Sequence, residues 1–85
     1  YQRVYDEIIE RDKSRGLNKK LLDGRYYERH HIVPRCMNGT NDKSNLVLLT
    51  GREHYLCHWL LIKIKPNNHK LFISITIELH TLDSS

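Results

Sequence analysis

Cysteine, proline and glycine are all scarce in this chain of 85 residues, which has two cysteines, two prolines and four glycines. The cysteines, Cys36 and Cys57, form neither a C-x-x-C pair nor the dense framework of small secreted proteins, so we expect free thiols in a reducing compartment. No linker, internal repeat or low-complexity tract divides the chain. We therefore expect residues 1–85 to form a single domain.

A long hydrophobic run is also absent. The longest apolar-rich stretch, residues 55–64, has about half of the roughly 20 residues that a membrane span needs, and no signal-peptide core opens the chain. We expect a cytoplasmic, intracellular protein with no membrane partner. Because the chain begins with Tyr1 rather than Met, we expect a processed chain or a fragment. A chain this short supports only a modest core, so a metal, disulfide or partner should add stability.

Positive charge is concentrated in one segment. The formal net charge is +4, and residues 25–65 hold seven Lys or Arg against three acids, while the remainder is neutral. Such a segment attracts polyanions through counterion release, although many solvated surfaces are mildly basic. Charge alone therefore leaves open both nucleic-acid binding and an ordinary solvated surface.

Hydrophobic periodicity predicts an α+β fold with a β-hairpin at its centre. Apolar residues at helical spacing over 1–9, with acids mostly on the opposite side, predict an amphipathic N-terminal helix that ends near Gly16. Residues 25–33 favour a strand that a proline ends. A turn-rich loop follows over 38–45, and the apolar run 46–49 favours a second strand.

A long helix should follow the second strand. Thr50 and Glu53 have the spacing of a capping box, in which two side chains satisfy free backbone donors, and Pro66 limits the helix to about Lys65. Its sequence leaves little polar surface, so we expect it to be largely buried. Residues 72–82 are ambiguous, because their apolar residues alternate as in a strand and also recur at helical spacing.

Four of the six histidines fall in two pairs. His54 and His58 lie one turn apart on one helical face, and such a pair either chelates a metal or forms hydrogen bonds in the core. A hairpin folded onto the helix would add His30, and three imidazoles leave a divalent metal open positions for water or substrate. His31 should point the other way unless strand twist brings it to the edge. A neutral imidazole there can take a proton from water.

The motif Y-E-R-H-H-I-V-P at 27–34, followed by N-L-V-L-L-T at 45–50 and R-E-H-Y-x-x-H at 52–58, resembles the HNH endonucleases. The similarity is greatest to small phage-type members and to the nuclease domains of colicins. It implies a small ββα-metal core at about 26–65 within an HNH nuclease domain. One departure is Asn38-Gly39, where related loops often carry two glycines. Because Asn tolerates left-handed geometry, the turn should survive.

Carried over position by position, the resemblance makes His30, His54 and His58 the metal ligands, His31 the general base and Asn45 the central Asn. In some relatives this Asn binds the metal directly. In those with a full set of histidines it hydrogen-bonds the loop and holds the general base in place, and we expect this second role for Asn45. An Asx turn that opens the second strand is the structural alternative.

Four charged residues flank the motif. Glu28 lies two positions before His30 and hence on the same strand face, where it either orients a ligand or an arginine or is a surface acid. Arg29, Arg35 and Arg52 are candidates for phosphate contact or for stabilising transition-state charge, and solvated surface positions are the alternative.

The resemblance implies metal-dependent hydrolysis of DNA, with strand nicking as the elementary event and 5′-phosphate and 3′-hydroxyl ends as products. Three imidazoles favour a borderline metal over magnesium. We expect one divalent metal ion with zinc-like binding, and the activating ion could be Mg, Mn, Ni, Co or Zn. A double-strand cut would need a homodimer or a second encounter, and target choice could reside in an additional DNA-binding region of a longer parent chain. A phage-encoded protein in a bacterial host is the implied source.

The rival hypothesis is a non-catalytic zinc module that binds nucleic acid or protein. In that case Cys36 or Cys57 completes a closed set of ligands with the histidines. Two observations oppose it: a closed site has no use for His31, and Cys57 lies on a different helical face from His54 and His58.

Overall fold

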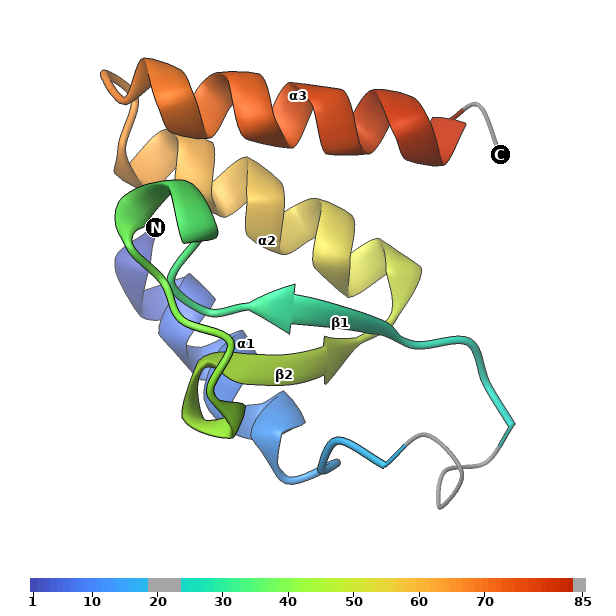
Figure 1. Cartoon of the computed structure of the whole chain (residues 1–85). Helices are drawn as coiled ribbons and strands as arrows, with labels where there is room; N and C mark the ends of the chain where they lie inside the picture. Colours follow the sequence, from blue (N-terminus) through green and yellow to red (C-terminus); the bar gives the residue numbers. More distant parts are fainter. Residues whose placement is uncertain (19–23, 84–85) are drawn as a thin grey trace.

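A two-stranded antiparallel sheet and three α-helices make up the described part of the chain (Figure 1). The computed structural model describes residues 1–18 and 24–83. The helices are α1 (Gln2–Lys13), α2 (Gly51–Ile64) and α3 (His69–Asp83), and the strands are β1 (Glu28–His31) and β2 (Leu46–Leu49). Helix α2 lies in the middle, with α3 on one side and the hairpin on the other (Figure 1). The predicted α+β class with a ββα core is confirmed.

The hairpin pairs a polar strand with an apolar one. His30 lies opposite Val47 and His31 opposite Leu46 in the register. All four residues of β2 are buried, whereas in β1 only His30 is. Strand β2 therefore anchors the sheet in the core, and its register decides which histidine of β1 turns inward. The first strand is shorter than predicted, with four residues rather than the whole of 25–33.

The loop between the strands contains two short 3₁₀ turns, Arg35–Met37 and Lys43–Asn45. Asn38 ends the first of them with φ 68°, which is the left-handed conformation expected of this position. At Gly39 a Cβ atom would overlap the backbone carbonyl of Val33. The loop is therefore folded back tightly on the residues that follow β1.

Helix α2 begins with the predicted capping box. The Glu53 backbone N–H donates to Thr50 Oγ1 at 3.2 Å, and the Thr50 N–H donates to Glu53 Oε1 at 2.9 Å. The buried residues of the helix are His54, Cys57, His58, Leu60 and Leu61. The expectation of a largely buried helix is wrong for the opposite face, because Tyr55, Leu56 and Trp59 are exposed.

Helix α1 buries Tyr5, Ile8 and Ile9 against the core. One of its acids departs from the predicted polar side, since Asp12 is only 2% exposed. Its carboxylate accepts a hydrogen bond from Arg11 at 3.0 Å. Arg11 also contacts Glu53 of the α2 capping box. This ionic network joins the end of α1 to the start of α2, while burial raises the pKa of the Asp12 carboxyl, whose Oδ2 has no hydrogen-bond partner among the described residues.

The ambiguous C-terminal segment is a helix. Leu71 and Ile75, four positions apart, are 1% and 3% exposed, while Ile73 between them is 56% exposed. This pattern follows the helical period, because a half-buried strand would have buried Ile73 and Ile75 together. The side chains of residues 77–83, which include Ile77, Leu79 and Leu82 of that pattern, lie outside the described part. Within residues 1–18 and 24–83, no helix combines the length and apolar composition that a membrane crossing needs.

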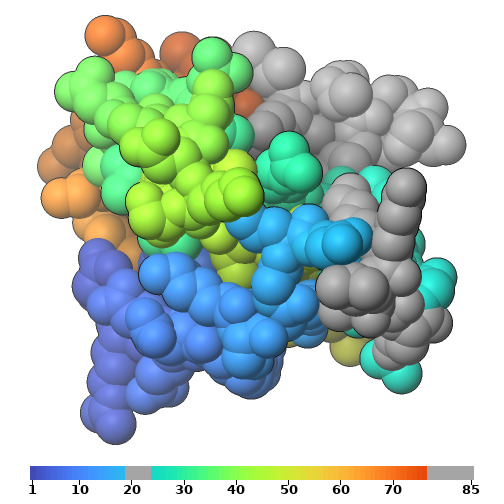
Figure 2. All heavy atoms as spheres, turned by 60° about the horizontal axis from the view of Figure 1, so that its bottom comes forward, coloured from blue at the N-terminus to red at the C-terminus, as the bar shows by residue number. Residues whose placement is uncertain are grey.

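The space-filling view in Figure 2 shows how the loop and α1 meet. The end of α1 and the residues after it (blue) lie beside the segment around residues 40–45 (lime green), although nearly thirty residues separate them in the sequence. Lys13 and Lys43 both line a hollow between these two segments.

The tight approach at Gly39 makes a first prediction. Gly39→Ala should lower the free energy of unfolding by at least about 1–3 kcal/mol, because the added methyl group displaces the Val33 carbonyl. The matched control is Gly51→Ala at the start of α2, where the new Cβ meets only Glu28 Oε1 at 3.7 Å. Urea denaturation should show the control unchanged or stabilised by up to about 1 kcal/mol. Equal stabilities of the two variants would contradict the described loop.

Candidate metal centre

Three buried histidines from two elements lie side by side under the hairpin. The ring centroids of His54 and His58 are 4.3 Å apart, as expected for residues one helical turn apart, and His30 reaches them from β1 at 5.1 and 5.4 Å. One nitrogen from each ring can be chosen so that all three lie within 4.8 Å of one another. The three residues are 2% to 9% exposed. The three could hold a metal ion.

Tyr5 of α1 determines which nitrogen of His30 is available. The Tyr5 hydroxyl lies 2.7 Å from the Ile32 carbonyl oxygen and 2.8 Å from His30 Nε2. A carbonyl only accepts, so the single phenolic hydrogen goes to Ile32, and Nε2 of His30 must carry a hydrogen that it donates to the phenol oxygen. His30 Nδ1 then keeps the lone pair. A metal-binding imidazole needs this tautomer fixed from outside.

Glu28 contacts the ring of His54 in the way that Tyr5 contacts the ring of His30. Its Oε1 lies 3.4 Å from His54 Nδ1, and its Oε2 accepts a hydrogen bond from the Tyr26 hydroxyl at 3.2 Å. Because a carboxylate accepts, His54 donates from Nδ1, which leaves Nε2 with its lone pair. Of the two roles predicted for Glu28, the geometry fits the orientation of a histidine. Carboxylate partners of this kind are common behind metal-bound imidazoles.

Burial keeps at least two of these rings neutral. Burial first, and then the charges of His54, His58 and His31, lower the pKa of His30 to about 2. Burial and His54 lower the pKa of His58 to about 4. At neutral pH both rings therefore have a lone pair to offer. Neutral imidazole is the form that binds transition metals.

His31 leaves the strand on the other side, at the rim of the same site. Its Nε2 lies 2.8 Å from Asn41 Oδ1 in the loop, and its ring lines the hollow that also contains the three clustered histidines. An amide oxygen accepts, so Nε2 carries the hydrogen and Nδ1 the lone pair. The structure thus brings His31 to the edge of the hollow, which is the exception left open to the sequence-based expectation that His31 points away.

Asn45 holds the loop closed through hydrogen bonds to the backbone. Its Oδ1 accepts from the Val33 N–H at 2.8 Å, and its Nδ2 donates to the carbonyls of Val33 at 3.1 Å and Thr40 at 2.8 Å. The backbone of Asn45 also accepts from the Ile32 N–H at 2.9 Å. These bonds join the residues directly after His31 to the end of the loop that carries Asn41. Asn45 therefore fixes both segments that bear on the His31 ring.

The hollow at the histidines has a volume of about 430 Å³ and is basic at its rim. Arg29 and Arg35 line it together with the histidines. Arg52 does not; it is exposed in the first turn of α2. Two of the three arginines singled out from the sequence are thus positioned to meet an anion that enters the hollow.

The donor set fits a borderline metal ion, and with three protein ligands it does not form a closed structural site. Three imidazole ligands suit zinc and its neighbours. Cys57 lies in the hydrophobic core, where burial raises the pKa of its thiol to about 12, and Cys36 lines the hollow. Among the residues described, neither cysteine joins the cluster. A site with three protein ligands leaves at least one position open.

Tyr5 and Asn41 were missed by reasoning from the sequence. Tyr5 was assigned to the core face of the N-terminal helix, and Asn41 to a turn-rich loop. They precede and follow their histidine partners by 25 and 10 residues, and no local pattern links residues so far apart. Only the docking of α1 and the closure of the loop bring these pairs together.

Comparison with known proteins identifies relatives in one phage. Probable mobile endonuclease D of Enterobacteria phage T4 is 50% identical over 68 residues, which are 80% of this chain and 26% of that protein. Probable mobile endonuclease B of the same phage is 55% identical over 64 residues, which are 75% of this chain and 24% of that protein. Probable mobile endonuclease E is 46% identical over 72 residues, which are 85% of this chain and 48% of that protein. The chain thus spans about a quarter to a half of these curated relatives. No family model and no solved structure matches it, so membership of the HNH family stays a prediction.

The contact between Tyr5 and His30 makes a second prediction. Tyr5→Phe removes the acceptor for His30 Nε2–H, so the ring loses the bond that fixes its tautomer. Zinc affinity, measured by competition with a chromogenic chelator, should fall by roughly 10–100-fold. Tyr55→Phe, the same change on an exposed face of α2, should leave the affinity unchanged. If both variants bind zinc as the wild type does, Tyr5 has no part in the centre.

Proposed function

We propose that this chain is a metal-dependent DNA endonuclease of the HNH type, and the cluster of three buried histidines is the observation that carries the proposal. The similarity to probable mobile endonucleases of phage T4 supports it. So does the hollow beside the cluster, which has cationic side chains and a fourth histidine at its rim. Because the chain spans only part of those relatives, the proposal concerns the nuclease centre.

His30, His54 and His58 would hold one divalent ion in this centre. Such an ion supplies positive charge that neutralises a phosphate as negative charge develops on it. The role of the chain is to present three lone pairs. Tyr5 and Glu28 orient two of the rings, and burial keeps His30 and His58 unprotonated.

His31 is the proposed general base. With its Nε2–H donated to Asn41 Oδ1, Nδ1 is the atom that accepts a proton from the attacking water. Asn41 also stabilises the imidazolium that forms, because its amide oxygen accepts more strongly from a charged donor. Asn45 contributes by holding the loop, as its bonds to Val33 and Thr40 show. In this proposal the central Asn positions the base and does not bind the metal.

Arg29 and Arg35 are the proposed phosphate contacts. Both line the hollow, and guanidinium groups pair with phosphate oxygens in a bidentate geometry that also aligns the ester for in-line attack. The positive charges of the two arginines and of a bound ion would together stabilise the transition state, which carries more negative charge on the phosphate than the substrate does.

The third prediction separates the base from the ligands. In a plasmid-nicking assay with a panel of divalent metals, His31→Ala should lower the nicking rate by roughly 10²–10⁴-fold, with zinc affinity unchanged. His58→Ala should abolish both nicking and tight zinc binding. His69→Ala, which alters an exposed histidine at the start of α3, should behave as the wild type, and EDTA should stop nicking by all active proteins.

Two outcomes would refute the proposal in different ways. If the wild type binds zinc but nicks DNA with none of the metals, the domain is a binding module. If His31→Ala nicks at the rate of the wild type, the centre is catalytic but another group acts as the base.

A further inference from the structure

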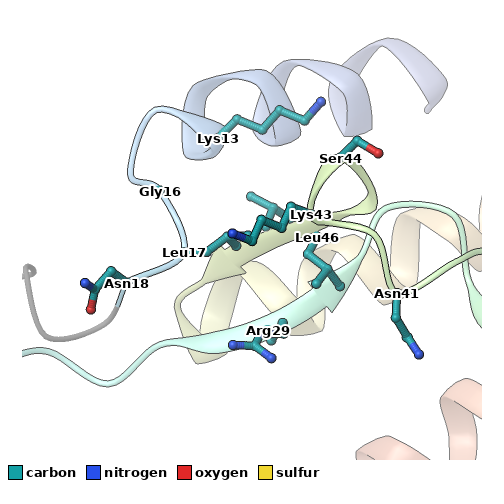
Figure 3. Close-up of a pocket in the computed structure, with 10 residues that line it drawn as sticks. Lys13, Gly16, Leu17, Asn18, Arg29, Asn41, Lys43, Ser44 and Leu46 are labelled. Carbon is teal, nitrogen blue, oxygen red and sulfur yellow. The ribbon is translucent and has the colours of Figure 1, made fainter.

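A second, larger hollow lies on the far side of the hairpin from α2. It has a volume of about 1060 Å³ and lies between the end of α1, strand β1 and the turn before β2 (Figure 3). Lys13 lines it from α1, Arg29 from β1 and Lys43 from the turn. The Lys43 side chain reaches toward Leu17, and the Lys13 side chain extends along α1 (Figure 3). Three cationic residues from three elements therefore line one space.

The described residues that line this hollow do not neutralise its charge. No carboxylate is among them. Within residues 1–18 and 24–83, Lys13, Arg29 and Lys43 form no salt bridge, whereas Arg3, Arg11 and Arg15 of the same end of the chain are all paired with acids. Three cations without acidic partners repel one another. Their grouping raises the local potential and favours an anion between them.

The size of the hollow indicates what kind of anion it fits. Clefts for small molecules measure about 300–1,000 Å³, so this one exceeds what a single phosphate ion needs. Its lining also includes apolar side chains, Leu17 and Leu46 among them, and small polar ones such as Ser44. A lining that combines cationic and apolar side chains suits a sugar-phosphate chain, whose sugars are uncharged and whose phosphates each carry one negative charge.

Two residues connect this hollow to the histidine centre. Arg29 lines both hollows. Asn41 lines the larger one, and its side chain bonds His31, which lines the smaller one. A strand whose phosphate reaches the histidines can therefore continue past Arg29 into the larger space.

We propose that the hollow formed by Lys13, Arg29 and Lys43 binds the backbone of the DNA substrate next to the phosphodiester that is cleaved. This inference rests on the proposed nuclease function, since it assigns the second site to the same substrate. The contacts are with phosphates, so the hollow holds the strand in position and reads no sequence.

The test measures DNA binding without cleavage. Fluorescence anisotropy of a labelled duplex in EDTA gives the affinity of the 85-residue chain over a series of salt concentrations. Each phosphate contact contributes about 0.9 to the slope of log K against log salt. Lys13→Gln with Lys43→Gln should therefore reduce the slope by about two. The control is Lys65→Gln with Lys70→Gln, which removes the same charge at the α2–α3 turn and should leave the slope nearly unchanged.

Restoring the charge is the internal check. Lys13→Arg with Lys43→Arg should recover the slope of the wild type, which a loss of folding would not do. Equal slopes for the two glutamine variants, or no binding by the wild type, would overturn the proposal. Nicking is scored separately with metal present. A wild type that binds DNA with the predicted slopes but does not cut refutes the nuclease function alone, whereas cutting with no difference in slope refutes the hollow alone.

Discussion

The burial of His30 between Tyr5 and the two histidines of α2 is the constraint on which the rest of the site depends. A buried imidazole must have its N–H satisfied, since leaving it without an acceptor costs about 1–3 kcal/mol, and the Tyr5 hydroxyl is that acceptor. The same hydroxyl bonds the Ile32 carbonyl, so α1 is attached directly to the end of β1. The helix that covers the core is therefore also the element that selects the nitrogen with which His30 faces the centre. A small domain buries little apolar surface, so a metal bound by these histidines would add to the free energy of unfolding.

The parts of the fold that could be predicted are those with local signals. Four apolar residues bounded by turns identified β2, and the capping box at Thr50 located the start of α2. Given those two elements, the spacing of His54 and His58 placed them on one face. The partners of the histidines were different, because Tyr5 and Asn41 have no local relation to His30 and His31. Their contacts arise from tertiary packing, which periodicity does not encode.

The errors in burial have a related cause. The acids of α1 are expected on its polar side, but Asp12 is buried near the capping box of α2, where Arg11 contacts both Asp12 and Glu53. Trp59 and Tyr55 were counted as core because they are apolar, yet α2 can bury only the face that meets the hairpin, α1 and α3. The C-terminal segment carried both periods, and the burial of Leu71 and Ile75 around exposed Ile73 settled it in favour of a helix. In each case the burial of a residue depends on which other element packs against it, and the sequence of a single segment does not contain that information.

Strand β1 combines two surfaces in four residues. Successive side chains of a strand point to opposite faces, so Glu28 and His30 face α2, where they meet His54, while Arg29 and His31 turn to the other side. Arg29 lines both hollows, so the proposed metal centre and the proposed DNA surface meet at this strand. Because β2 fixes the register, a slip of one residue would exchange the two faces and bring Arg29 and His31 into the core. Strand β2 prevents this slip, because all four of its side chains are buried in the core and cannot change position without losing that packing. The adjacent histidines can then have different roles, because His30 is buried with the other two clustered histidines whereas His31 lines the same hollow from a less buried position.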